Sequence, residues 1–85
     1  MRLSPLCKLH GRPGCYVLMV YISEPMALEV NDSFAFLWEQ LSGKEFTLSD
    51  VSTLLEEKFE LDPEVALKEA QQVIVLWRDS HLMTD

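Results

Sequence analysis

The sequence predicts an α+β fold in which three short antiparallel strands precede three helices. Two observations support this prediction. Residues 6–31 are rich in strand formers broken by turn residues, whereas residues 31–80 place apolar side chains at helical spacing. The chain has 85 residues, which is enough for only one small core, so we expect a single domain over residues 1–85.

Three runs of strand-forming residues are separated by turns that contain glycine or proline. They lie at Leu6–Leu9, Tyr16–Ile22 and Met26–Val30. In the third run, Met26, Leu28 and Val30 occupy one face, and Ala27 and Glu29 occupy the other. This alternation is typical of a half-buried strand.

Capping residues mark the starts of three amphipathic helices. Three candidates for the N-cap of the first helix are Asn31, Asp32 and Ser33, and Thr47 with Asp50 resembles a capping box for the second. Asp62 and Pro63 open the third helix, which should run to about residue 80. The residues expected to share one core are Phe34, Leu37, Trp38, Leu41, Leu54, Leu55, Phe59, Ala70, Val73 and Trp77.

Charge is distributed unevenly along the chain, whose net charge is -7. Residues 1–23 carry Arg2, Lys8 and Arg12 and no acid, whereas residues 24–85 carry four basic and fourteen acidic residues. Proteins that bind nucleic acid begin with a basic surface that neutralises phosphates. We therefore expect no nucleic-acid partner.

No group of residues has the spacing of a catalytic or metal site. His10 and His81 lack a nucleophile or acid nearby in the sequence, and three glycines at scattered positions cannot form a phosphate-binding loop. Cys7, His10, Cys15 and His81 do not follow the tight paired spacing of structural zinc ligands. We expect no enzymatic activity, no cofactor and no metal.

The longest apolar run covers residues 15–22, which is far shorter than the roughly 20 residues of a membrane-spanning helix. The N-terminus lacks the apolar region and cleavage site of a secretory signal. These features predict a cytoplasmic protein without a membrane partner.

The third helix carries more apolar surface than one core can cover. Residues 73–77 are five consecutive apolar residues, and at about 100° per residue they surround the helix. If Val73 and Trp77 face the core, Ile74 lies on one flank and Leu76 on the other. The surplus surface could be clamped between other elements, form a groove, or pair with a second copy of the chain.

The segment Leu28–Trp38 resembles the strand, asparagine cap and Trp-ending helix that mark the PqqD family, which acts in pyrroloquinoline quinone (PQQ) biosynthesis. The resemblance continues through later segments in the same order. These are Leu41–Gly43, Thr47–Phe59, Leu61–Glu64 and Ser80–Met83. His81 departs from the pattern, because the family often has glycine there.

The resemblance implies a winged helix-turn-helix-like domain that serves as a recognition element for ribosomally made, modified peptides. Such a protein is a non-catalytic peptide chaperone. The leader of a precursor peptide would add as a strand to the third strand, lie beside the third helix, and be presented to a radical-SAM or other modifying enzyme. The residues expected to bind the peptide are Met26, Ala27, Leu28, Glu29, Val30, Leu67, Gln71, Ile74, Val75 and Arg78.

Two alternatives belong to other functional classes. A structural or oligomerising subunit would use the apolar surface of the third helix to form a homodimer. A winged helix that binds DNA is less favoured, because the second helix carries Asp50, Glu56 and Glu57 against a single base, Lys58.

Overall fold

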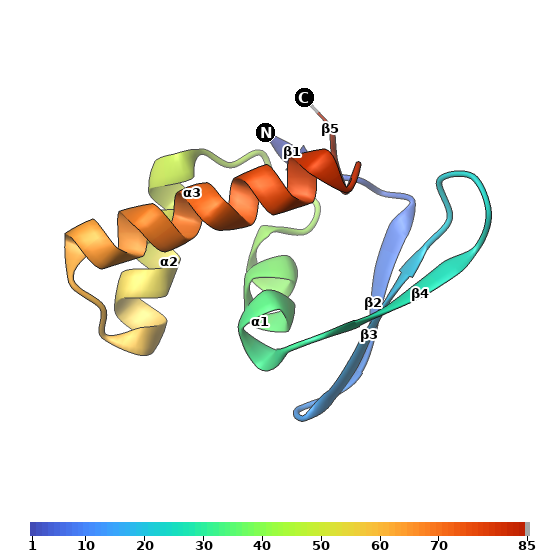
Figure 1. Ribbon diagram of the computed structural model, residues 1–85, viewed down its shortest axis with the longest axis horizontal. Helices are drawn as coiled ribbons and strands as arrows, with labels where there is room; N and C mark the ends of the chain where they lie inside the picture. The colour runs from blue at the N-terminus through green and yellow to red at the C-terminus, as the bar shows by residue number, and fades with distance from the viewer. Residues whose placement is uncertain (85) are drawn as a thin grey trace.

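A computed structural model describes residues 1–84. A three-stranded antiparallel sheet of order β2-β3-β4 is followed by three helices, and a second, two-stranded sheet joins the chain ends (Figure 1). The elements are β1 (Arg2–Leu3), β2 (Cys7–Arg12), β3 (Cys15–Val20), β4 (Met26–Val30), α1 (Asp32–Leu41), α2 (Leu48–Phe59), α3 (Pro63–Asp79) and β5 (Met83–Thr84). The predicted α+β class, with three antiparallel strands preceding three helices, is confirmed.

A tight hairpin joins β2 to β3. Arg12 pairs with Cys15, so only Pro13 and Gly14 form the loop. Gly14 has a φ of 84°, and a proline followed by a residue of positive φ is typical of a type II turn. The Gly14 N–H also donates to Asp32 Oδ1 at 2.9 Å, which ties the hairpin tip to the first turn of α1.

The strand bounds differ from the prediction in the hairpin and agree with it in β4. The first strand was predicted at Leu6–Leu9, but β2 continues to Arg12 because the turn needs only two residues. The second was predicted to reach Ile22, but β3 ends at Val20 and the following side chains are exposed. The third strand covers Met26–Val30 as predicted.

Each helix begins at a predicted cap, and Asn31 is the one of the three candidates that caps α1. Asn31 Oδ1 accepts a hydrogen bond from the Phe34 N–H at 2.8 Å. Thr47 and Asp50 form the reciprocal capping box, with bonds of 3.2 and 2.9 Å. Asp62 precedes Pro63 at the start of α3, although its side chain makes no capping bond.

The hydrogen bonds that end α3 explain the backbone conformation of His81, the residue that stands where the family often has glycine. The His81 N–H donates to Arg78 O at 3.1 Å and the Leu82 N–H donates to Trp77 O at 2.8 Å, which is the bonding pattern of a Schellman motif. His81 therefore takes a left-handed conformation, with a φ of 59°. Glycine is the residue that adopts this conformation at least cost, which gives a physical reason for glycine in the family pattern.

The chain ends are joined by a contact that the sequence analysis did not predict. β1 pairs with β5 in antiparallel register, and the Ser4 N–H donates to Leu82 O at 2.9 Å. The Met1 ammonium group donates to Phe46 O at 2.9 Å. These bonds place β1 and β5 beside the C-terminal end of α3 (Figure 1).

Aromatic rings form the centre of the core. The Trp77 ring is fully buried and lies perpendicular to the rings of Phe34, Trp38 and Phe46, at centroid distances of 5.7 to 6.3 Å. Most residues of the predicted core are buried or half-buried in one cluster. Phe59 is the exception, because its side chain is 38% exposed and packs at the surface against Phe36.

The buried stripe of α3 differs from the prediction at one position. Ile74 is buried, whereas Val73 is only half-buried. Both residues fit the helical spacing from Ala70 to Trp77. The choice between them depends on how α3 is rotated against the other elements, which its own sequence does not determine.

Candidate functional site

β4 is an edge strand of the three-stranded sheet, and its backbone polar groups alternate in direction. The Tyr21 N–H donates to Leu6 O at 2.8 Å, which fixes the phase of the β2–β3 ladder. Odd-numbered residues of β3 therefore bond to β2, and even-numbered residues bond to β4. It follows that the N–H and C=O of Leu28 point toward β3, while those of Ala27 and Glu29 point to the free edge.

The side chains of β4 alternate as the sequence predicts. Leu28 and Val30 are half-buried and pack against the core, while Ala27 and Glu29 are exposed. Met26 lies on the core-facing side but at the end of the strand, and its side chain is 52% exposed. The free edge is thus flanked by apolar side chains on the face that meets the helices.

An apolar hollow lies between the helices at the point where β4 ends. This α1–α3 groove has a volume of about 480 Å³. Its lining comprises Asn31, Ser33, Phe34, Leu37, Leu55, Phe59, Leu61, Val65, Glu69, Val73, Leu76 and Trp77. Asn31 directly follows the last residue of β4, so the end of the strand adjoins the groove. Glu69 is the one charged residue among those that line it.

The face of α3 that meets the groove comprises Val65, Glu69, Val73 and Leu76. Val65 and Leu76 are also among the most exposed large apolar residues of the chain. Sequence alone placed Leu76 on one flank of the helix but did not determine which flank is open.

The residues of α3 expected to bind peptide lie elsewhere. Ile74 is 6% exposed and belongs to the core. Leu67 is exposed beside the start of α2, and Arg78 Nη2 lies 3.9 Å from Met1 Sδ. Gln71 and Val75 are exposed, and neither lines the groove. The structure therefore does not bring these five residues together with β4 in one hollow.

The two cysteines lie far apart, and the residues described form no metal-binding cluster. Cys7 and Cys15 lie at opposite ends of the β2–β3 hairpin, since Cys7 pairs with Val20. Within residues 1–84, no group of three or more His, Cys, Asp or Glu side chains could hold a metal ion. Burial raises the pKa of the Cys7 thiol, while a hydrogen bond with Ser4 lowers it by a smaller amount. A buried neutral thiol is a poor nucleophile.

None of the helices formed by the described residues is both long and apolar enough to span a bilayer.

Comparison with known proteins assigns the chain to a family. A family model described as "Coenzyme PQQ synthesis protein D (PqqD)" matches residues 16–83, which include β3, β4 and all three helices. Comparison with curated proteins and with solved structures gives no significant match. The chain therefore belongs to the PqqD family, whose members are non-catalytic accessory proteins that work with biosynthetic partners in making PQQ and related peptide-derived products.

Proposed function

We propose that this chain binds the leader of a ribosomally made precursor peptide and presents it to a modifying enzyme such as a radical-SAM protein. The leader adds as a strand to the free edge of β4, over Met26–Val30, and inserts an apolar side chain into the α1–α3 groove. The observation that carries the proposal is the nearness of these two features, because Asn31, the residue after β4, lines the groove. Family membership supports the same role.

The two features would contribute differently to binding. Hydrogen bonds to the backbone of Ala27 and Glu29 give affinity with little dependence on the leader's sequence. The groove supplies selectivity, since a side chain must match its apolar lining. From α3 we assign this role to Val65, Val73 and Leu76, in place of the flank that contains Leu67 and Gln71.

The backbone part of the proposal is tested at Glu29. Glu29→Pro removes a donor from the free edge while leaving the ladder to β3 intact, because proline is tolerated in an edge strand whose N–H faces outward. Glu29→Ala is the matched control, since it removes the carboxylate and keeps the donor. The titrations use a candidate leader peptide, identified by searching the genes near that of this chain for a short precursor. In NMR titrations with this peptide, we expect Glu29→Pro to weaken binding at least tenfold and Glu29→Ala to change it little.

The same titrations locate the site. Amide shifts should concentrate in residues 26–30 and in the groove, where the Trp77 indole N–H gives a separate signal. Equal losses in both Glu29 variants, or shifts that spare residues 26–30, would contradict strand addition. Light scattering with and without the leader decides the oligomerisation alternative. A dimer that the leader does not dissociate would assign the apolar surface of α3 to a second copy.

A further inference from the structure

The sheet has a second free edge, at β2. The ladder phase set by the Tyr21–Leu6 hydrogen bond directs the backbone groups of Lys8 and His10 toward β3. The N–H and C=O groups of Leu9 and Gly11 consequently point away from the sheet. β2 thus offers donors and acceptors at an edge that the leader would not occupy.

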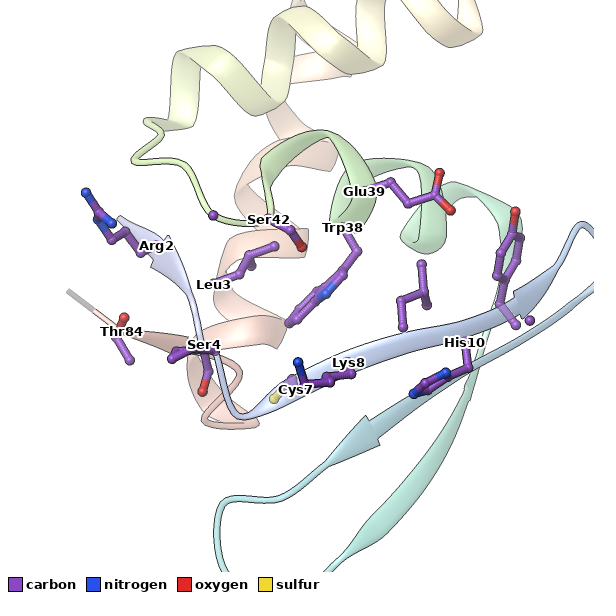
Figure 2. Close-up of a pocket in the computed structure, with 15 residues that line it drawn as sticks. Arg2, Leu3, Ser4, Cys7, Lys8, His10, Trp38, Glu39, Ser42 and Thr84 are labelled. Atoms are coloured by element: carbon purple, nitrogen blue, oxygen red, sulfur yellow. The ribbon is translucent and has the colours of Figure 1, made fainter.

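A large hollow extends around this edge. The β2 recess has a volume of about 750 Å³ and shares no lining residue with the α1–α3 groove. Lys8 and His10 line it from the solvent-facing side of β2, and Leu9 lines it from the core-facing side. Leu3 and Trp38 are buried and form its apolar floor. Figure 2 shows Trp38 beside β2, with His10 on the opposite side of its ribbon.

The charge at this edge is opposite to that of the rest of the chain. Lys8, His10 and Arg12 follow one another at alternate positions of β2, so their side chains share the solvent-facing side of the sheet. Arg2 also lines the recess. Glu39 is the one acid in the lining and belongs to α1, so the charge along β2 itself is basic.

These charges restrict what can pair with the edge. Two β2 strands from different copies would bring their basic side chains together, and like charges across a strand pair are destabilising. Edge lysines are a common way to prevent such pairing. A strand with acidic residues at alternate positions would instead gain attraction at each of them.

We propose that the β2 edge and its recess bind an extended segment of a partner protein in which acidic and apolar residues alternate. The acidic side chains lie over Lys8, His10 and Arg12, the apolar ones enter the recess beside Leu9 and Trp38, and the segment's backbone pairs with Leu9 and Gly11. This site is separate from the β4 edge and does not rest on the proposed leader binding.

The test uses a synthetic peptide that alternates glutamate and leucine, long enough to cover the 6 residues of β2. A second peptide of the same composition, with its glutamates and leucines in separate blocks, is the control. In NMR titrations of the full chain we expect the alternating peptide to shift the amides of residues 7–12 and the Trp38 indole signal. We also expect the block peptide to bind at least fivefold more weakly.

Charge reversal at one position tests the electrostatic part. Lys8→Glu should weaken binding of the alternating peptide about three- to tenfold, because a cross-strand ion pair becomes a repulsion. Lys68→Glu makes the same change in net charge at an exposed site on α3 outside the recess and should leave affinity unchanged. Thermal melts confirm that both variants fold.

Three results would overturn the proposal. Equal binding of both peptides would mean that net charge alone attracts them. Shifts confined to residues 26–30 would place the peptide on β4. A dimer of the free protein whose interface involves residues 7–12 would assign this edge to a second copy. Leader binding at β4 is measured with a different peptide, so either proposal can fail alone.

Discussion

Ile74 and Leu76 are large aliphatic residues two positions apart in the same apolar run of α3, and their side chains differ sharply in solvent exposure. Ile74 is 6% exposed, whereas Leu76 is 56% exposed. Side chains two positions apart on a helix point in directions that differ by about 200°. Ile74 therefore faces the core, while Leu76 faces solvent at the groove. The comparison shows that hydrophobicity alone does not distinguish a residue that stabilises the fold from one available to a ligand.

The two sides of α3 should therefore respond differently to substitution. Changes on the buried side, which includes Ala70, Ile74 and Trp77, should lower the free energy of unfolding. Changes on the groove side, at Leu76, should lower affinity for a peptide while leaving the fold intact.

The largest expected effect is at Trp77, whose ring contacts three other aromatic side chains. Trp77→Ala should destabilise the protein by about 3–5 kcal/mol, the usual cost of truncating a buried aromatic side chain. A small domain has only about 5–10 kcal/mol in total, so the variant should be close to unfolding at room temperature. Circular dichroism melts measure this, and a cooperative transition within a few degrees of the parent's would contradict the central role of Trp77.

Much of the fold could be predicted because its signals are local. The Asn31 cap, the Thr47–Asp50 capping box and the alternation in β4 each involve residues close in sequence, and each is present in the structure. The pairing of β1 with β5 was missed because it joins two-residue strands at opposite ends of the chain. No periodic pattern exists in so short a segment.

Only part of the candidate site could be predicted from the sequence. The edge position of β4 follows from the order of the strands, but the open side of α3 does not follow from its sequence. Val73 and Ile74 both fit the helical spacing of a core stripe, and only the structure shows that Ile74 is buried and Val73 half-buried. The β2 recess was also missed, because it forms between residues far apart in sequence, such as Leu9 and Trp38.

A smaller effect is expected at Ile74. Ile74→Ala removes a buried aliphatic side chain and should cost about 2–5 kcal/mol, below the effect at Trp77 because fewer contacts are lost. Val75→Ala is the matched control at the next position, where the side chain is 53% exposed, and it should change stability by less than about 0.5 kcal/mol. Urea unfolding measures both, and equal midpoints would show that α3 is rotated from the orientation described.

The smallest effect concerns binding at Leu76. Leu76→Asp places a charge in the wall of the α1–α3 groove without disturbing the core, so stability should change by no more than about 0.5 kcal/mol. Affinity for the leader should fall at least tenfold, or about 1.4 kcal/mol, because an apolar side chain of the leader would then pack against the introduced carboxylate.

Val75→Asp is the control for Leu76→Asp, because it adds the same charge at a similarly exposed position that does not line the groove. It should leave leader affinity within about twofold of the parent's, since long-range repulsion between exposed charges is largely screened at physiological salt. Titration calorimetry at that salt compares the two variants directly. Equal losses would mean that charge on α3, and not the groove, governs binding. A loss in Val75→Asp alone would move the site to the flank that contains Leu67 and Gln71.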